Sequence, residues 1–186
     1  VFIGWATSPD GYVEYTSGQE ITLTGDLTLY AKWTVEGSIY TMDGLKYKVT
    51  STNPHTVELT GYDGDEPSGE LNIPATVNGA TVTSIGEQAF LACLDLTSVI
   101  IPNCVTNIGP LAFSGCSRLA SVFVLATTPP TLGNNAFIGN ANNRKIYVPI
   151  DIVNTTYKPS WSAYWEDIYA FPHGSCGDGL TWEFNG

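Results

Sequence analysis

Residues 85–102 read IGEQAFLACLDLTSVIIP, and eight of these residues recur at the same spacing 23 positions later, from Ile108 to Val122. A third copy begins at Leu132-Gly133 and keeps an Ala-Phe pair at 136–137 and a strand with proline at 146–149. A degenerate earlier strand lies at 71–74. A repeat of this length is typical of a solenoid, in which every copy forms one coil.

Each copy places apolar residues where stacked coils can bury them. Two sets recur, one with the spacing of a strand and one in the opposite turn: Leu96, Val99 and Ile101, and Ile85, Ala89 and Phe90. One coil cannot bury these residues alone, but neighbouring coils bury them as a continuous core. The sequence therefore predicts a mainly β fold built around a short solenoid.

The unit I-G-x-x-A-F-x-x-C-x-x-L-x-S-V-x-I-P resembles the BspA-like leucine-rich repeat, over roughly residues 68–171. The resemblance implies a right-handed β-solenoid with short convex-side helices, closed at 149–171 by a C-terminal cap with Trp161, Tyr164 and Ile168. It also implies export, attachment to a bacterial cell surface, and adhesion. The third copy has Gly139-Asn140 in place of the cysteine and Thr-Thr-Pro-Pro at 127–130, which leaves the regularity of the last coil open.

The N-terminal region is predicted to form strands and turns. Residues 1–34, with Gly4-Trp5 and the turn Ser-Pro-Asp-Gly at 8–11, resemble the second half of an internalin-type B repeat, a β-grasp spacer of bacterial surface proteins. A generic β-hairpin appendage is the alternative. Residues 39–67 are expected to form a hairpin that caps a leucine-rich-repeat domain at 39–171. Residues 172–186 resemble the start of a following segment.

Composition narrows the possible partners. The chain has a net charge of -11 and only seven Lys and Arg residues, which argues against a nucleic acid or an anionic membrane as partner. No apolar run is long enough to span a bilayer, so no membrane insertion is expected. An extracellular protein or glycan is the expected partner, at a bacterial cell surface or after secretion.

No enzyme, metal or cofactor motif is evident. Cys93 and Cys116 hold equivalent positions in neighbouring coils and form either buried thiols or a disulfide. Cys104 and Cys176 have no obvious partner, and neither His55 nor His173 lies within the repeats to serve as a catalytic base.

The acidic residues of the chain form no recognisable catalytic pair. Asp63, Asp65 and Glu66 match no complete calcium loop, so a solvated acidic loop is expected. We therefore expect neither catalysis nor a bound cofactor.

The outward face of the strands carries the candidate ligand-binding residues. If Val99 and Ile101 point inward, alternation along the strand directs Ser98 and Ile100 outward. Transfer of this register to the other coils predicts two outward columns: Glu70, Ser98, Ser121 and Lys145, and Asn72, Ile100, Phe123 and Tyr147.

The second column is unexpectedly apolar, and contiguous exposed apolar surface often marks a contact site. The alternative is that a neighbouring segment, such as the hairpin at 39–62, covers it. Trp161 and Trp165 would either stack on sugar rings or pack within the cap. The sequence thus predicts a non-enzymatic adhesion module, and the alternative function is a structural spacer in a long stalk.

Overall fold

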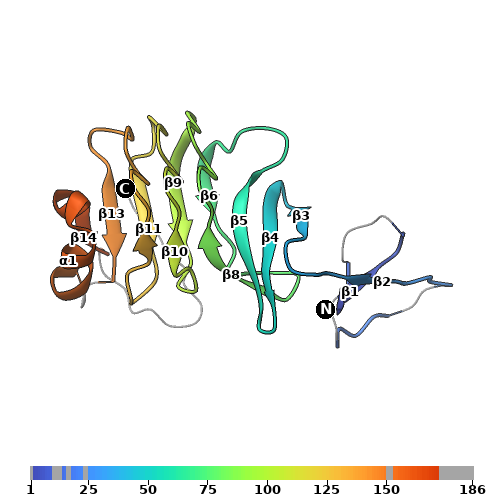
Figure 1. Ribbon diagram of the computed structural model, residues 1–186. Coiled ribbons are helices and arrows are strands. Elements are labelled where there is room, and N and C mark those ends of the chain that lie inside the picture. Colours follow the sequence, from blue (N-terminus) through green and yellow to red (C-terminus); the bar gives the residue numbers. More distant parts are fainter. Residues whose placement is uncertain (1, 10–13, 16–17, 23–24, 150–152, 172–186) are drawn as a thin grey trace.

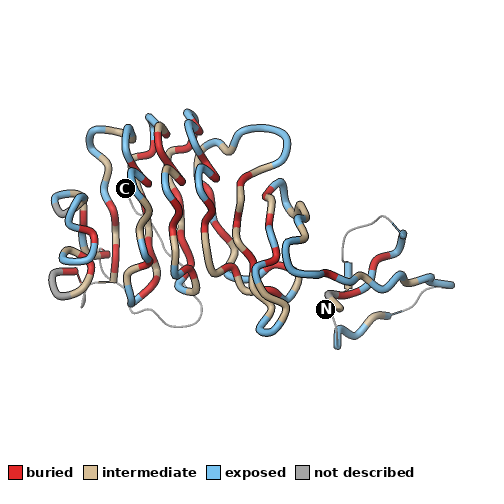
Figure 2. The backbone as a smooth tube through the Cα atoms, in the orientation of Figure 1, coloured by how far each residue is buried: buried red, intermediate tan, exposed pale blue. Residues whose placement is uncertain are grey.

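The computed structural model describes residues 2–9, 14–15, 18–22, 25–149 and 153–171 of the protein. Among these residues almost all regular structure is β, and Figure 1 shows the strands of successive coils side by side in a row. Buried and less buried residues alternate along these strands (Figure 2), as expected where one face of each strand meets the core. The predicted β-solenoid is confirmed.

Two sheets enclose the core of the solenoid. The hairpin sheet contains seven strands: β3 (Ile39–Met42), β4 (Leu45–Thr52), β5 (His55–Tyr62), β8 (Ala80–Ile85), β10 (Asn107–Ile108) and β12 (Thr131–Leu132), with β7 (Thr76–Val77) paired to β8. The face sheet contains five: β6 (Gly69–Asn72), β9 (Leu96–Ile101), β11 (Ser121–Val124), β13 (Lys145–Val148) and β14 (Ile168–Ala170).

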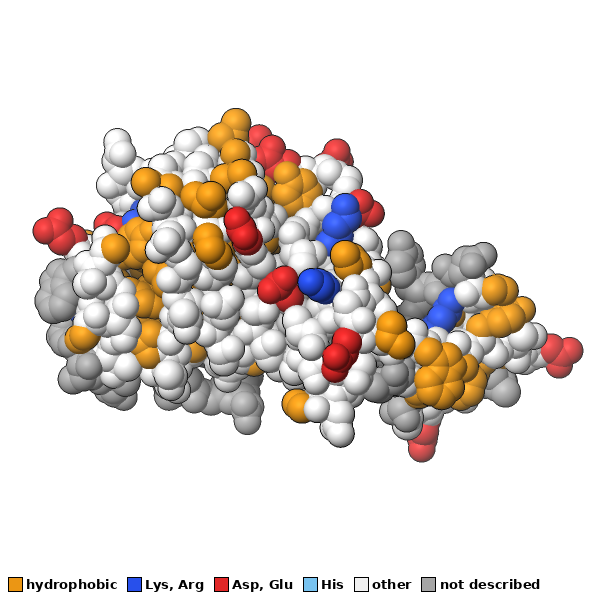
Figure 3. Space-filling view, viewed as in Figure 1, with side chains coloured by type: hydrophobic (Ala, Val, Ile, Leu, Met, Phe, Trp, Pro, Cys, Tyr) orange, Lys and Arg blue, Asp and Glu red, His pale blue; other side chains and the backbone are white. Residues whose placement is uncertain are grey.

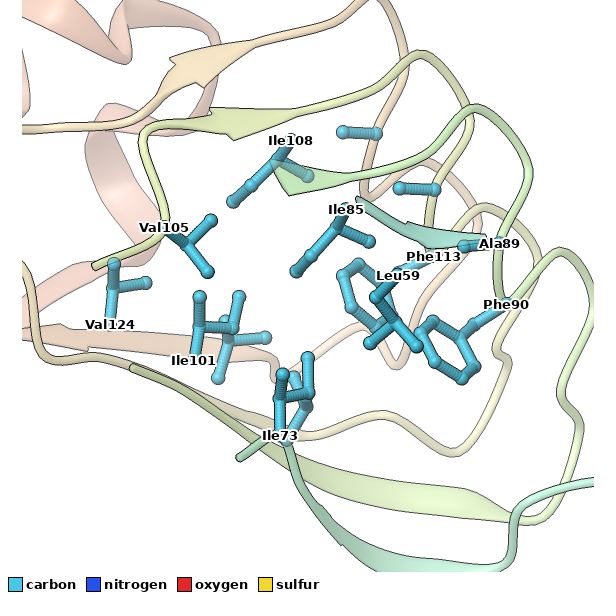
Figure 4. Packing of buried hydrophobic residues seen from close by; sticks show 14 of the residues in the cluster. Leu59, Ile73, Ile85, Ala89, Phe90, Ile101, Val105, Ile108, Phe113 and Val124 are labelled. Atoms are coloured by element: carbon cyan, nitrogen blue, oxygen red, sulfur yellow. The ribbon is translucent and has the colours of Figure 1, made fainter. Parts of the chain in front are cut away.

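Within each sheet the coils are stacked in parallel register, which follows from the regular spacing of the repeat. In the hairpin sheet Ile85 pairs with Ile108, and Ile108 pairs with Leu132. In the face sheet Val99 pairs with Val122, which is followed by Ile146 of β13. Figure 4 shows side chains from both sheets, including Ile85, Ile108 and Ile101, pointing into the same interior.

The phenylalanines of the repeat form a stacked column through the core. The rings of Phe90 and Phe113 lie 5.2 Å apart at 10°, and those of Phe113 and Phe137 lie 5.4 Å apart at 5°. Tyr62 stacks on Phe90 at one end, 6.3 Å away, and Trp161 packs against Phe137 at the other, at 6.2 Å. The hairpin and the cap therefore each supply an aromatic residue that closes the column.

The hairpin forms the N-terminal end of the solenoid. Strands β3, β4 and β5 pair antiparallel with one another, and β5 pairs in parallel with β8. Leu59 of β5 therefore lies beside Ile85 at the position that a preceding coil would otherwise fill. The hairpin predicted within residues 39–67 is present, and β4 and β5 are its two long strands.

The segments on the convex side are turns, although short helices were expected there. Gln88, Leu111 and Asn135 hold equivalent places in three coils and all have positive φ values, between 56° and 58°. Ala92 has a φ of 59° where the next coils have glycine. A residue in the left-handed region cannot continue a right-handed helix, and two such residues per coil keep these segments short.

At the C-terminal end a compact cap follows the last coil. It contains a π-helical turn η2 (Val153–Tyr157), a short α1 (Lys158–Ser160) and a 3-10 segment η3 (Ser162–Asp167), then β14. Trp161 is only 2% exposed, and its indole nitrogen donates to the Pro130 carbonyl at 2.9 Å. The cap thus seals the core with a buried aromatic side chain.

Near the N-terminus, β1 (Phe2–Ala6) and β2 (Tyr30–Trp33) pair antiparallel as a two-stranded sheet of their own. Apolar side chains gather over this sheet in Figure 3, and Trp33 is 71% exposed. Ring contacts join Phe2 to Trp5 and to Trp33.

Candidate ligand-binding face

The face sheet brings the outward residues into two columns. Glu70, Ser98, Ser121 and Lys145 are paired in that order across four strands. The second column runs through the next outward position of the same strands and continues onto β14: Asn72, Ile100, Phe123, Tyr147 and Tyr169. All candidate residues on these strands therefore lie on one surface.

Three aromatic residues of the second column form an aromatic strip, defined here as Phe123, Tyr147 and Tyr169. The Phe123 and Tyr147 rings stack at 4.9 Å and 12°, and Tyr169 follows Tyr147 at 6.4 Å. Tyr169 is 43% exposed, and the other two are half-buried. Stacking fixes the rings before any ligand arrives, which lowers the entropy lost on binding.

The first column supplies polar groups beside the strip. The Ser98 hydroxyl lies 3.4 Å from a Glu70 carboxylate oxygen, and the exposed Lys145 ammonium lies 5.3 Å from the centre of the Tyr169 ring. A surface with flat rings, hydroxyls and one ammonium can stack on an apolar ring face and hydrogen-bond to polar groups.

Among the described residues, a segment of the chain does lie on this face, but it is not the hairpin. The hairpin extends the other sheet through the β5–β8 pairing. Instead the Phe171 ring stacks on Phe123 at 6.2 Å and 14°, and the Phe171 amide donates to the Val148 carbonyl at 3.0 Å. The strip is therefore partly covered at its Phe123 end and open at Tyr169.

Two residues of this face, Tyr169 and Phe171, could not be predicted from the repeat. Tyr169 and Phe171 follow the cap helices, where the repeat has ended and no copy gives the register. The apolar residue Ile168 is the one nearby indication of the register, because it pairs with Ile146 and, like Ile146, points into the core.

The cysteines of the repeat are structural. Cys93 and Cys116 are fully buried free thiols, and Cys116 donates to the Phe90 carbonyl at 3.1 Å. A hydrogen bond with Cys116 and burial raise the pKa of the Cys93 thiol, which keeps it protonated. Cys104 is half-buried and donates to the Ala75 carbonyl. Cys176 lies outside the described residues.

In the last coil Asn140 takes over the role of the missing cysteine. Its side-chain amide donates to the Phe113 carbonyl at 2.7 Å, just as the Cys116 thiol donates to Phe90 one coil earlier. The departure from the repeat at 139–140 therefore preserves the bond between coils.

The acidic loop makes structural contacts. Asp63 pairs with Lys46 at 2.9 Å, and a Glu66 carboxylate oxygen accepts the Leu94 amide at 2.6 Å. In the part of the chain that the structure describes, no three His, Cys, Asp or Glu side chains come together as metal ligands.

Within the residues that the structure describes, the remaining candidates form no catalytic arrangement. His55 lies at the start of β5, where burial lowers the pKa of its imidazole. Trp161 packs within the cap, as one of the two alternatives predicted. His173 and the Trp165 side chain lie outside the described residues.

The sequence comparisons agree with the geometry. Residues 70–160 match the family described as BspA type leucine rich repeat region, in six copies. The solenoid is a BspA-type leucine-rich repeat region. Residues 1–32 match the Listeria-Bacteroides repeat domain. These two kinds of repeat typify bacterial surface proteins, and leucine-rich repeats serve widely in protein interaction.

Solved structures similar to the BspA-type solenoid come from bacteria. A leucine rich cell surface protein from Faecalibacterium prausnitzii is 28% identical, with a TM-score of 0.46, over 60% of this chain and 33% of that one. A leucine-rich repeat protein from Bacteroides capillosus is 27% identical, with a TM-score of 0.44, over 60% of this chain and 98% of that one. The match thus spans about a third of the first protein.

No curated protein matches the sequence. Among the described residues of this chain, no helix is both long and apolar enough to cross a bilayer.

Proposed function

We propose that this chain is a non-enzymatic adhesion module displayed on a bacterial surface, which binds an extracellular protein or glycan through the face sheet. The observation that carries the proposal is the aromatic strip, because an outward position of a solenoid strand needs no apolar residue to complete the core. Stacked, partly exposed rings at such positions favour a role in contact with a ligand.

The residues around the strip suit a ligand with both apolar and polar surface. Ile100 and Asn72 continue the column of Phe123 and Tyr147 across the sheet. Ser98, Ser121 and Lys145 would donate hydrogen bonds along its side, and Lys145 adds a positive charge on a chain whose net charge is -11. An acidic sugar or a peptide with an apolar side chain and a carboxylate would match this arrangement.

The experiment measures binding of the purified chain to immobilised extracellular-matrix proteins and glycans. We expect Phe123→Ala and Tyr169→Ala to weaken binding by at least about tenfold, the effect typical of an aromatic anchor. Leu94→Ala is the matched control, because Leu94 is also apolar and is 53% exposed but lies in a turn outside the face sheet. Circular dichroism of each variant establishes that it is folded.

Equal binding by the wild-type chain and the folded Tyr169→Ala and Phe123→Ala variants would contradict the proposal. The second candidate function is a spacer within a stalk, which the stacking of Phe171 on Phe123 favours because it withdraws part of the strip from solvent. A spacer predicts that the folded wild-type chain binds nothing on the panel.

A further inference from the structure

A cleft of about 600 Å³ lies at the N-terminal end of the solenoid, at the opposite end of the face sheet from Tyr169. One wall comes from the hairpin, including the turn at Asp43-Gly44 and Tyr47. The other comes from β6 and the residues next to it, including Glu70 and Asn72. Its size is that of a typical binding pocket, which occupies about 300–1,000 Å³.

The cleft exists because the two sheets end differently. The hairpin sheet continues past β8 into β5, β4 and β3, whereas the face sheet stops at β6. In the described residues β6 pairs only with β9. The wall on this side is therefore the edge of a sheet.

The edge of β6 presents backbone groups to the cleft. The Gly69 amide donates to the Asp95 carbonyl, and the Ile73 amide donates to the Ile100 carbonyl. These two amides therefore point toward β9 and the loop before it. Because backbone groups alternate in direction along a strand, the N–H and C=O groups of Glu70 and Asn72 point away from β9. Such an edge is a template for another strand.

All charged residues that line the cleft are acidic. Four of its lining residues are acidic and none is Lys, Arg or His; the acidic residues are Asp43, Asp63, Asp65 and Glu70. Lys46 pairs with Asp63, which leaves the other three carboxylates to dominate the local field. The lining also includes apolar side chains: Met42, Leu45, Leu71 and Val77.

We propose that this cleft binds an extended basic peptide segment of a partner protein, which adds to β6 as a further strand. Its backbone pairs with Glu70 and Asn72, its Lys or Arg side chains face the carboxylates, and the apolar side chains between them contact the lining. Pro67 and Pro74 flank β6 and confine the pairing to this short stretch, which prevents longer edge-to-edge association. The cleft shares Glu70 and Asn72 with the two outward columns but contains no residue of the aromatic strip, and this proposal does not depend on the proposed function.

The test uses the whole chain and a fluorescent peptide of alternating lysine and valine, (Lys-Val)3, with (Glu-Val)3 as the charge-reversed probe. We expect fluorescence anisotropy to show binding of (Lys-Val)3 only. The double variant Asp43→Asn/Asp65→Asn should weaken binding of (Lys-Val)3 about tenfold, since it removes two carboxylates that pair with the lysine side chains of the peptide. Asn tolerates the φ of 50° at residue 43, so the turn is retained. Glu87→Gln, at an exposed acid in a convex turn, is the matched control.

A second variant tests the strand edge itself. Asn72→Pro removes the amide that points into the cleft without removing a bond to β9, and should weaken (Lys-Val)3 binding by about fivefold. Phe123→Ala should bind (Lys-Val)3 like the wild type, whatever it does to adhesion. The proposal is overturned if (Lys-Val)3 does not bind, if (Glu-Val)3 binds equally well, or if the carboxylate variants match the Glu87→Gln control.

Discussion

Gly133 lies directly against Pro110 of the preceding coil: a Cβ atom on Gly133 would come within 2.2 Å of the Pro110 nitrogen. Gly109 stands in the same relation to Glu87, whose nitrogen would lie 2.6 Å from an added Cβ. The glycine of the repeat is therefore required by the close approach of neighbouring coils, and in neither case by a positive φ.

We expect Gly133→Ala to destabilise the fold by about 3 kcal/mol, because the obstructing atoms belong to backbone and cannot move aside. Urea denaturation would measure the change. Gly25→Ala is the control, since an added Cβ there has nothing within 4 Å, and should change stability by less than about 0.5 kcal/mol. Equal stabilities of the two variants would contradict the packing described.

Arg144 joins the last coil to the cap. Its side chain is 10% exposed, donates to the Phe137 carbonyl at 2.6 Å, and pairs with Asp167. We expect Arg144→Met to cost about 2 kcal/mol of stability, because it leaves Asp167 and a carbonyl without their partner. Arg118→Met, which breaks the exposed pair with Asp95, should cost less than about 0.5 kcal/mol. Thermal unfolding of both variants compares these effects.

Two tyrosines whose hydroxyl oxygens are buried should respond in opposite ways to loss of the hydroxyl. The Tyr40 hydroxyl is buried with no hydrogen-bond partner in the described residues, whereas the Tyr157 hydroxyl donates to the Ala126 carbonyl at 2.6 Å. We expect Tyr40→Phe to stabilise the fold by about 1 kcal/mol and Tyr157→Phe to destabilise it by a similar amount. Chemical denaturation would reveal the two signs, and a shared sign would refute the assignment.

Alkaline pH should weaken the fold. Burial raises the pKa of Tyr40 to about 12, above the value of about 10 for an unfolded chain. As the pH rises, the Tyr40 hydroxyl therefore loses its proton in the unfolded chain before it does so in the folded protein. The contribution of neutral Tyr40 to the free energy of unfolding is complete below about pH 10 and is lost as the pH rises toward 12. The free energy of unfolding, measured from pH 9 to 12, should fall less steeply in Tyr40→Phe. Parallel curves for the two proteins would exclude a role for Tyr40.

The sequence was sufficient to predict those parts of the fold that repeat. The constant spacing from Ser98 to Ser121 gives the register of β9 and β11 directly, so the outward columns follow from the repeat alone.

The parts that could not be predicted depend on contacts outside the repeat. The contact between Phe171 and Phe123 depends on the path of the chain through the cap, which the repeat does not specify. The acidic cleft depends on the pairing of β5 with β8, a long-range contact that leaves no periodic signal in residues 39–67. Convex helices were expected because the left-handed conformation of Leu111 cannot be read from its side chain.

The aromatic column that ends in Tyr62 and Trp161 has a consequence for how such proteins diversify. Because each coil presents its neighbour with nearly the same surface, a gene duplication that inserts one more unit between Cys93 and Cys116 leaves both terminal aromatics with suitable partners. The outer surface then grows by one strand spacing, about 4.8 Å, without any new end piece. Duplication or deletion of whole units can therefore change the length of the solenoid, and with it the width of its outer surface, while both end caps stay the same.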